Sequence, residues 1–435
     1  MDQIRVGICG LGTVGGGTLN LIQENCADLR ARAGAEIRVT HIGARSPKPE
    51  FNLAGIRQSE DIFELARDPD VDILVESIGG IEPAKTLVLE AISSGKHVVT
   101  ANKALIAEHG NELIKAAEAA GVTLAFEAAV AGAIPVIRSL RDGLAANQIK
   151  ELAGIINGTG NFILTEMRDH GRVYEDVLKE AQELGYAEAD PTFDVEGIDA
   201  AYKLCILASI AFSIPLNFEK VYTQGISQLA QKDVLFAEEL GYRIKHLGIA
   251  KATERGIEMR VHPTLIPEEV PLANVDGVMN AVWIEGNASG PTMYYGAGAG
   301  ALPTASSVVA DIIEIARTQR VGAACGTPPL GVALADQKDR PILAIEDCTT
   351  AFYLRITAAD KPGVMLSITQ ALTEASLSID AIIQKEAESK SNTVPIVLIT
   401  SVAAESVLNS AVAKIEALQD IVEPVVSIRV EALEG

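Results

Sequence analysis

The sequence predicts an α/β protein with a doubly wound parallel sheet at the N-terminus, an α+β domain in the middle and a ferredoxin-like βαββαβ module at the C-terminus. Three observations predict this class. Short apolar strands alternate with helices over the first 135 residues, strands and helices are mixed without that alternation up to about residue 320, and residues 350–435 run strand, helix, strand, strand, helix, strand. The 435 residues also exceed what one hydrophobic core usually serves.

The first domain is expected over residues 1–135. Strands are expected at 4–9, 36–44, 71–76, 97–100 and 122–126, with helices from about 13 and near 60–66, 83–94 and 104–119. Short β-rich runs separated by helices indicate parallel strands joined by crossover helices.

The second domain, for substrate binding and dimerisation, is expected over residues 136–320, and its last helix, 304–320, is expected to pack back on the first domain. Its other helices are expected near 159–170, 174–184, 194–213 and 226–241, and its strands near 148–157, 243–252, 257–266 and 278–287. A linker at 321–349 precedes the C-terminal module at 350–435. That module has expected strands near 351–358, 377–387, 393–401 and 424–432 and helices near 363–375 and 404–418.

Composition and charge exclude several functional classes. The net charge is −22 and no cluster of Lys and Arg is visible, which argues against partners such as nucleic acid or an anionic membrane. No apolar run is long enough to span a bilayer, and the N-terminus lacks signal-peptide organisation. The five cysteines are scattered, without a Cys-x-x-Cys pair, so we expect a cytoplasmic protein without disulfides or structural zinc.

A glycine-rich loop follows the first predicted strand. Gly10-Leu11-Gly12-Thr13-Val14-Gly15 has the Gly-x-Gly-x-x-Gly spacing and lies at the start of a helix. The glycines permit a tight turn, close approach of the backbone to a pyrophosphate and close packing of the helix on the sheet. Free N–H groups at the helix N-terminus suit the phosphates. The loop therefore predicts a Rossmann dinucleotide-binding domain; the alternative is a glycine-rich turn without a ligand.

The end of the second predicted strand bears on the choice of cofactor. An NAD site usually places Asp or Glu there for the ribose hydroxyls, whereas this chain has Arg45 and Ser46, with Lys48 close behind. A guanidinium and a hydroxyl suit a 2′-phosphate. This favours NADP, with NAD also possible; the alternative is an exposed loop arginine.

A segment rich in charged and turn residues leads into a very apolar helix near residue 204. Asp199 and Lys203 stand four residues apart on one face of that helix. Lysine rarely lies in such an apolar helix without a partner or a role. Spacing alone leaves two readings open, an ordinary ion pair at the helix entrance and a functional lysine.

The residues of this segment resemble the signature of homoserine dehydrogenases. Ala181-x-x-x-Gly185-Tyr186-Ala187-x-x-Asp190-Pro191-x-x-Asp194-Val195-x-Gly197-x-Asp199-x-x-x-Lys203 contains every element of that signature. Further runs resemble the same family, in the same order: Thr100–Ala104, Glu127–Pro135, Asn157–Ile163 and Gly296–Gly300. The resemblance covers the whole chain, and since no aspartate-kinase region precedes the first strand, it is to the monofunctional form.

The resemblance implies reversible, NAD(P)-dependent interconversion of L-aspartate 4-semialdehyde and L-homoserine, in threonine, methionine and isoleucine biosynthesis. Lys203 would be the general acid for the developing alkoxide, assisted by Lys103 near nicotinamide and substrate. The implied substrate contacts are Glu188, Asp199, Asp194, Tyr186, Gly158 and Thr159. Besides the glycine loop and Arg45, the expected cofactor contacts are Ser77, Thr100, Lys103, Gly185 and Gly300.

The resemblance also implies a monovalent cation, usually sodium, on a loop. Its ligands map to the Glu127 carboxylate and the backbone carbonyls of Val130, Gly132 and Ile134, which suit a hard cation. Its role would be to fix the loop rather than to perform chemistry.

In the C-terminal module, Asp360-Lys361-Pro362-Gly363-Val364 resembles the ligand loop of ACT domains, with Asp360 and Gly363 as effector contacts. The implied effector is L-threonine, as feedback inhibitor; the alternative is a dimerisation domain that has lost its ligand. We expect a homodimer or homotetramer.

Two alternatives to this function remain open. One is another Rossmann oxidoreductase that acts on an amino-acid aldehyde or imine. The other is a non-catalytic amino-acid sensor that kept the fold, against which the intact set of Lys103, Glu188, Asp199 and Lys203 argues.

Overall fold

The computed structural model describes residues 3–46, 48–322, 326–385 and 392–433. Cys325 and part of the expected linker lie outside the described residues. The chain folds into two compact units, each made of three segments. Unit 1 comprises Met1–Gly158, Asp199–Val221 and Val278–Arg340, and unit 2 comprises Thr159–Ile198, Tyr222–Gly277 and Pro341–Gly435.

Unit 1 contains a six-stranded parallel sheet in the order β3-β2-β1-β4-β5-β6. Its strands are β1 (Gln3–Cys9), β2 (Glu36–Gly43), β3 (Arg57–Ser59), β4 (Ile73–Glu76), β5 (His97–Thr100) and β6 (Leu124–Ala125). This order places the carboxyl ends of β1 and β4 side by side at the point where the strand order reverses, which is where such sheets bind ligands. The predicted doubly wound sheet is confirmed.

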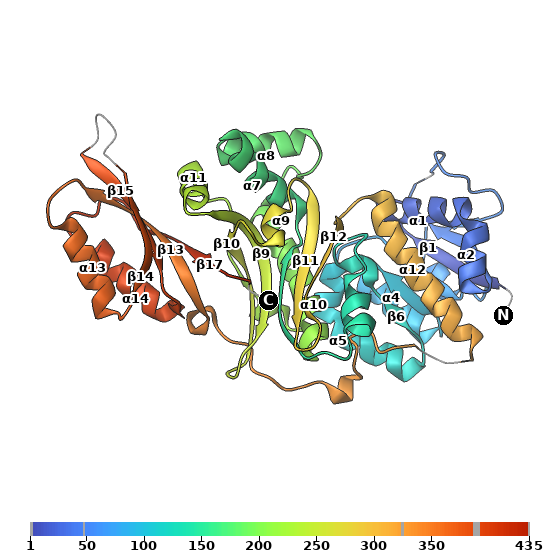
Figure 1. Cartoon of the computed structure of the whole chain (residues 1–435). Helices are drawn as coiled ribbons and strands as arrows, with labels where there is room; N and C mark the ends of the chain where they lie inside the picture. The colour runs from blue at the N-terminus through green and yellow to red at the C-terminus, as the bar shows by residue number, and fades with distance from the viewer. Residues whose placement is uncertain (1–2, 47, 323–325, 386–391, 434–435) are drawn as a thin grey trace. The chain divides into compact units, whose positions relative to one another are not determined.

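Helices cover both faces of this sheet (Figure 1). They are α1 (Thr13–Glu24), α2 (Cys26–Ala33), α3 (Ile62–Arg67), α4 (Ala84–Ser93), α5 (Lys103–Ala120) and α12 (Ala301–Arg320). Helix α12 packs along α1 and also touches α2 and β5. The core between them joins Leu19 of α1 and Val308 and Ile312 of α12 to strand residues such as Val6 and Val75.

Unit 1 also contains the antiparallel strands β7 (Ile149–Ile155), β11 (Met279–Gly286) and β12 (Gly290–Ala297) and most of helix α10 (Ile198–Phe212). Strand β11 lies between β7 and β12. Almost every residue of α10 is buried, as its apolar sequence requires.

Unit 2 is built around a sheet in the order β9-β10-β17-β13-β15-β14, with the short strand β8 (Tyr222–Thr223) beside β10. The strands are β9 (Tyr242–Ala252), β10 (Ile257–Pro267), β13 (Thr349–Ala359), β14 (Ile379–Gln384), β15 (Thr393–Thr400) and β17 (Val426–Val430). Its helices are α7 (Gly158–His170), α8 (Tyr174–Glu183), α9 (Thr192–Val195), α11 (Gln231–Glu239), α13 (Val364–Glu374) and α14 (Glu405–Glu416).

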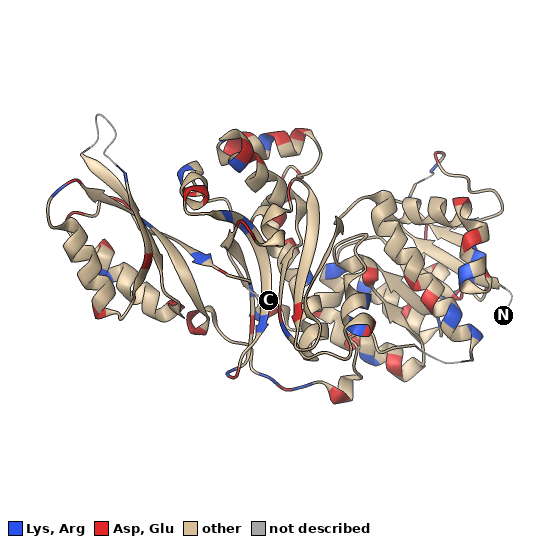
Figure 2. Ribbon diagram, viewed as in Figure 1, with Lys and Arg blue, Asp and Glu red and all other residues tan. Residues whose placement is uncertain are grey.

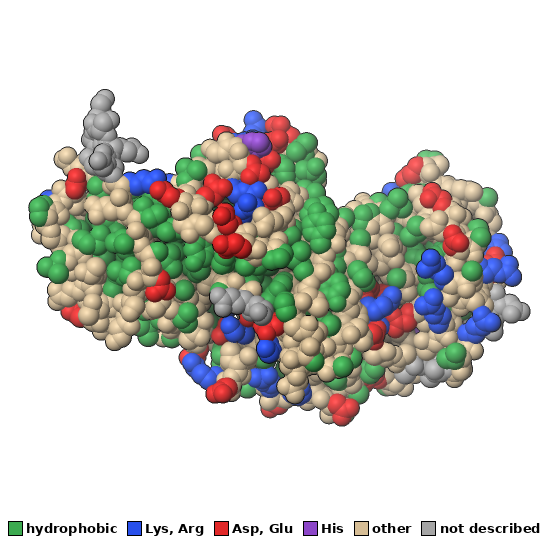
Figure 3. All heavy atoms as spheres, in the orientation of Figure 1, with side chains coloured by type: hydrophobic (Ala, Val, Ile, Leu, Met, Phe, Trp, Pro, Cys, Tyr) green, Lys and Arg blue, Asp and Glu red, His purple; other side chains and the backbone are tan. Residues whose placement is uncertain are grey.

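The C-terminal module of unit 2 has the predicted βαββαβ order. Strands β13, β14, β15 and β17 form its sheet, and α13 and α14 pack together over one face, around Ile368, Leu408 and Ile415. Apolar side chains gather on the visible face of this module (Figure 3). Acidic and basic residues are interspersed along the helices and loops of both units (Figure 2). Within the described residues no helix has the length and apolar character needed to cross a membrane.

Several elements differ from the sequence-based expectation, among them the short strands β3 and β8, which were not predicted. The helix expected over 194–213 is divided into α9 and α10, because Gly197 between them has φ +85°. The helix expected from 226 begins at Gln231. Strand β12 was not predicted, because a glycine and a proline begin it; it is formed as the second arm of a hairpin with β11.

Candidate active site

The turn between β1 and α1 requires its glycines. Gly10 has φ +92°, and a Cβ there would lie 2.8 Å from the Ser77 carbonyl oxygen. A Cβ on Gly15 would lie 1.9 Å from the Gly10 carbonyl oxygen. Ser77 Oγ donates hydrogen bonds to the carbonyls of Cys9 and Gly10, at 3.0 and 2.8 Å. The turn is therefore held tightly against the end of β4.

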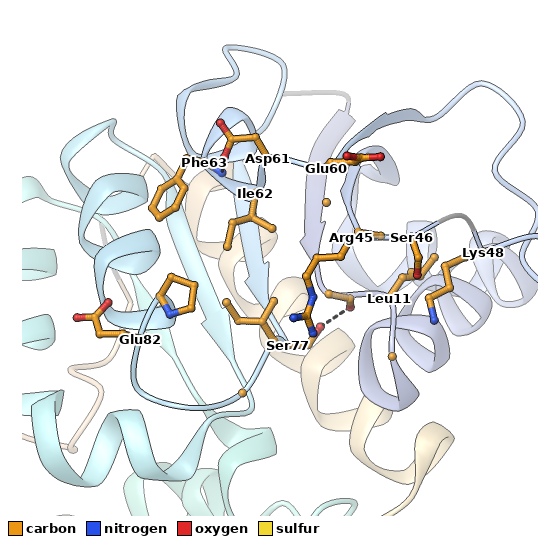
Figure 4. A pocket seen from close by; sticks show the side chains of 17 residues that line it. Leu11, Arg45, Ser46, Lys48, Glu60, Asp61, Ile62, Phe63, Ser77 and Glu82 are labelled. Carbon is orange, nitrogen blue, oxygen red and sulfur yellow. Dashed lines mark hydrogen bonds between the residues drawn. The ribbon is translucent and has the colours of Figure 1, made fainter.

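This turn forms one wall of a cavity of 670 Å³, within the range of small-molecule and cofactor sites (Figure 4). The expected residues Gly10, Leu11, Gly12, Arg45 and Ser77 all line it. Thr13 and Val14 are the first residues of α1, so the free N–H groups of that helix begin at the cavity. The cradle and the helix end fit a dinucleotide phosphate.

Two cationic side chains and the Glu60 carboxylate lie at one end of the cavity (Figure 4). Arg45, Ser46 and Lys48 line it, and in Figure 4 the Arg45 side chain extends into the cavity toward Ser77. Lys48 and Ser46 also line an adjoining cavity of 220 Å³. Two carboxylates that the sequence analysis missed, Glu60 and Asp61, line the main cavity as well. The available signal was their place just after β3, at the carboxyl edge of the sheet.

Thr100 is buried beside this wall rather than in the lining of the cavity. Its hydroxyl donates a hydrogen bond to the buried Glu76 carboxylate and accepts one from Asn102 N at 3.0 Å. Glu76 also accepts hydrogen bonds from Ile78 N and Gly79 N, and burial raises its pKa. Thr100 thus orders the loop after β4.

Two lysines far apart in the sequence meet on one carboxylate within unit 1. Asp199 accepts from Lys203 Nζ at 2.7 Å on one oxygen and lies 3.1 Å from Lys103 Nζ on the other. Lys203 Nζ also donates to the Ile156 carbonyl at 2.6 Å, and Asn157 Nδ2 donates to Asp199 at 2.9 Å. The Asp199 side chain is 6% exposed, so this is not a surface ion pair. Asp199 is therefore shared by two lysines and is more than an isolated i,i+4 ion pair at a helix entrance.

The ionisation state of Asp199 follows from these contacts. Burial opposes its charge, but the Lys203 and Lys103 ammonium groups outweigh burial and lower its pKa to about 2. Asp199 is therefore an anion at neutral pH that fixes two cations. The contact of Asn157 with Asp199 was not predicted, although Asn157 begins one of the runs that resemble the family; its place two residues after β7 was the available signal.

Two further expected glycines belong to unit 1. A Cβ on Gly158 would lie 2.8 Å from the Val278 carbonyl oxygen, so the chain needs glycine there. Gly300 has φ +126° and precedes α12. A Cβ on Gly17 of α1 would lie 2.6 Å from the Ala301 carbonyl oxygen, so the start of α12 lies close against α1.

The other expected substrate residues form a separate group in unit 2. Thr159 Oγ1 donates to the Tyr186 carbonyl at 2.6 Å and lies 3.3 Å from Asp194 Oδ2. The Tyr186 ring packs edge-on against Phe162, with centroids 5.2 Å apart. Gly185, with φ +75°, ends α8 just before Tyr186, and Glu188 is exposed on the loop that follows. The first turn of α7 therefore holds the 185–194 loop.

The expected cation loop lies in unit 1. The buried Glu127 carboxylate accepts from Ile137 N and Arg138 N at 3.0 and 2.9 Å, and burial raises its pKa. The Gly132 carbonyl accepts from Ser307 Oγ at 2.6 Å. Among the described residues no group of three or more His, Cys, Asp and Glu side chains could hold a metal ion. A site here would depend on carbonyls, from Val130, Gly132 and Ile134.

The expected effector loop joins β13 to α13 in unit 2. Asp360 is exposed, and its N–H donates to the Asn392 carbonyl at 2.8 Å. Gly363, with φ +96°, is the residue before α13, whose first N–H groups therefore face this loop.

Family models match three consecutive parts of the chain. The model of the homoserine dehydrogenase NAD-binding domain matches residues 10–127, and that of homoserine dehydrogenase matches residues 135–313. The ACT domain model matches residues 352–420. The first part contains the glycine turn and Lys103, the second contains Asp199 and Lys203, and the third covers most of the C-terminal module.

Similar proteins cover the whole chain. It is 57% identical over 433 residues to a homoserine dehydrogenase of Pseudomonas aeruginosa, with 100% of both sequences covered. A crystal structure of a homoserine dehydrogenase from Thiobacillus denitrificans has a TM-score of 0.95 at 56% identity and covers 100% of this chain and 99% of that one. A hyperthermophilic archaeal homoserine dehydrogenase in complex with NADPH has a TM-score of 0.62 at 28% identity, over 72% of this chain and 97% of that one. The chain belongs to the homoserine dehydrogenases, NAD(P)-dependent oxidoreductases, and carries an NAD-binding domain and a C-terminal ACT domain.

Proposed function

We propose that Lys203 is the general acid that protonates the alkoxide formed when L-aspartate 4-semialdehyde is reduced to L-homoserine. The observation that carries this assignment is the buried Asp199 carboxylate with two lysine ammonium groups on it. Bound NADPH or NADH supplies the hydride. Lys203 donates the proton and Lys103 adds positive charge beside the same oxygen, which stabilises the developing negative charge. Asp199 fixes both lysines, as Asn157 fixes Asp199.

The remaining substrate contacts are assigned to Glu188, Asp194, Tyr186, Gly158 and Thr159. The exposed Glu188 carboxylate suits the substrate ammonium group. The hydrogen bonds of Thr159 to the 185–194 loop support a preformed group of contacts. Gly185 and Gly300 are assigned to the cofactor on their positive φ and on their positions at helix ends.

NADP is the preferred cofactor in this proposal, and NAD is also accepted. Arg45, Ser46 and Lys48 supply two positive charges and a hydroxyl at one end of the cavity, a set that suits a 2′-phosphate. Glu60, in the same lining, suits ribose hydroxyls, which supports acceptance of NAD.

A monovalent cation, sodium, is assigned to Glu127 and the carbonyls of Val130, Gly132 and Ile134. The buried Glu127 carboxylate supports this assignment, since a cation would offset the cost of burying its charge. The cation would hold the 130–134 loop and take no part in proton transfer.

L-Threonine is assigned as an effector to the loop of Asp360 and Gly363, where the start of α13 offers N–H groups to a carboxylate.

A homodimer or homotetramer is supported by the edge strand β12, on which Met293 and Tyr295 are exposed. The expected location is the cytoplasm.

One assay tests the cofactor and effector assignments. Oxidation of L-homoserine is followed at 340 nm with NADP and with NAD, with and without L-threonine, in sodium or choline chloride. Arg45→Ala is expected to raise the KM for NADP about tenfold, because one charge-assisted hydrogen bond to the 2′-phosphate is lost. The KM for NAD, which lacks that phosphate, should stay within about twofold of the unmodified value. An equal effect on both cofactors would refute the 2′-phosphate role. Rates unaffected by threonine or by sodium would refute those two assignments separately.

A further inference from the structure

Lys245 is a lysine on β9 whose side chain is fully buried within unit 2. Its ammonium donates to the Val275 carbonyl at 2.7 Å and to Asp276 Oδ1 at 2.9 Å, and lies 3.4 Å from Asn161 Oδ1. Burial lowers its pKa to about 8. Burying a lysine is costly, so this position invites a functional explanation beyond packing.

The contacts of Lys245 converge on the segment of residues 275–277, which α7 also binds. Asn161 Nδ2 donates to the carbonyls of Val275 and Gly277 at 3.0 and 2.9 Å. Thr165 Oγ1 accepts from Gly277 N at 3.0 Å. The Lys245 ammonium thus lies where β9, the 275–277 segment and the side of α7 that carries Asn161 and Thr165 meet.

The other side of the first turn of α7 holds candidate substrate residues. Thr159 binds the Tyr186 carbonyl and lies near Asp194, and Phe162 packs on the Tyr186 ring. Residues 159 and 162 therefore contact the 185–194 loop, while residues 161 and 165 contact the 275–277 segment. The rigid helix turn links the two sets of contacts.

We propose that Lys245 is a positioning residue for the substrate: it anchors the 275–277 segment to α7 and thereby sets the position of Thr159 and of the 185–194 loop. This inference rests on the proposed assignment of Thr159, Tyr186 and Asp194 to the substrate. Asp276 completes the anchor, because its Oδ1 also accepts from Arg168 of α7 at 2.9 Å.

The test is Lys245→Met, which keeps most of the side-chain volume and removes the charge and the donors. The KM for L-homoserine should rise about tenfold, equivalent to about 1.4 kcal/mol, while the KM for NADP stays within about twofold. Asp276→Asn is a milder variant for the case that Lys245→Met does not fold, and its KM for homoserine should rise about threefold. In a double-mutant cycle with Thr159→Ala, the effects should be non-additive.

The matched control is Lys96→Met in unit 1. Lys96 is also a buried lysine that donates to two backbone carbonyls, those of Asp68 and Val71. The Lys96→Met variant should be less stable to heat, as Lys245→Met is, but its KM for homoserine should be unchanged. An unchanged KM in folded Lys245→Met, an equal rise in Lys96→Met, or additive effects in the cycle would each overturn the inference. Failure of the unmodified chain to oxidise homoserine, measured first, would instead refute the proposed function.

Discussion

At the scale of single residues, the Asp199 carboxylate distinguishes this site from an ordinary ion pair, because it pairs with two lysines instead of one. Its two oxygens hold Lys203 and Lys103, which lie 100 positions apart in the sequence. Its pKa of about 2 keeps it charged at neutral pH, so both lysines stay paired with it. A proton donor held in this way needs little reorganisation when the alkoxide forms.

Replacing Lys203 tests this arrangement. In Lys203→Met, kcat for homoserine oxidation, the direction in which Lys203 accepts the hydroxyl proton, should fall by about 10²–10⁴-fold, because the methionine side chain cannot take up that proton. The control is Lys150→Met, since Lys150 is a half-exposed lysine of β7 paired with Glu285. The control should keep kcat within about twofold. Full activity of Lys203→Met would show that another group transfers the proton.

Part of the site could be predicted from the sequence and part could not. The spacing of Asp199 and Lys203 sets their contact, because residues four apart on a helix are neighbours. The glycine turn was likewise predictable, since Gly10 and Gly15 are required by local geometry. Lys103 and Asn157 reach Asp199 only through the tertiary fold, and no local pattern shows such a meeting. The family resemblance predicted the role of Lys103, but neither the local pattern nor the resemblance predicted the contact of Asn157 with Asp199.

At the scale of elements, α12 is a late segment of the chain that completes the core of the nucleotide-binding sheet. Its buried residues Val308, Ile312 and Ile315 pack with residues of α1, α2 and the strands. Sequence periodicity identified a helix here because the apolar residues recur at helical spacing. The division at Gly197 and strand β12 could not be predicted in that way, since a backbone φ and a hairpin partner decided them.

Substitutions at two isoleucines of α12 test how much the packing of this helix contributes to stability. Ile312 is fully buried, and its neighbour Ile313 is partly buried against the same core. Ile312→Ala should lower the free energy of unfolding by about 2–5 kcal/mol, the range for a buried aliphatic residue replaced by alanine. Ile313→Ala should cost clearly less, because less apolar surface is lost. Urea unfolding of both variants measures the difference; equal losses would contradict the burial described for α12.

At the scale of the whole molecule, buried histidines in both units make the free energy of unfolding depend on pH. Burial lowers the pKa of His97 in unit 1 and of His246 and His262 in unit 2, that of His246 to about 4. These side chains are neutral in the folded chain, whereas in the unfolded chain they take up protons below about pH 6.5. At these three histidines the unfolded state therefore binds more protons as the pH falls, which lowers stability. Buried carboxylates with raised pKa values, those of Glu76, Glu127 and Asp311, act in the opposite direction.

The contribution of the buried histidines to the free energy of unfolding should accordingly be lost between pH 6.5 and 4. His246 alone contributes a loss of about 3 kcal/mol once pH 4 is reached, from its shift in pKa. His246→Gln keeps a donor for the Gln224 carbonyl, and this variant should flatten the slope of stability against pH. His170→Gln is the control, because the His170 side chain is 61% exposed. This substitution should leave the slope of stability against pH unchanged. Denaturant unfolding at pH 7.5, 6.0 and 5.0 measures these slopes; a slope that His246→Gln leaves intact would mean that other groups take up the protons.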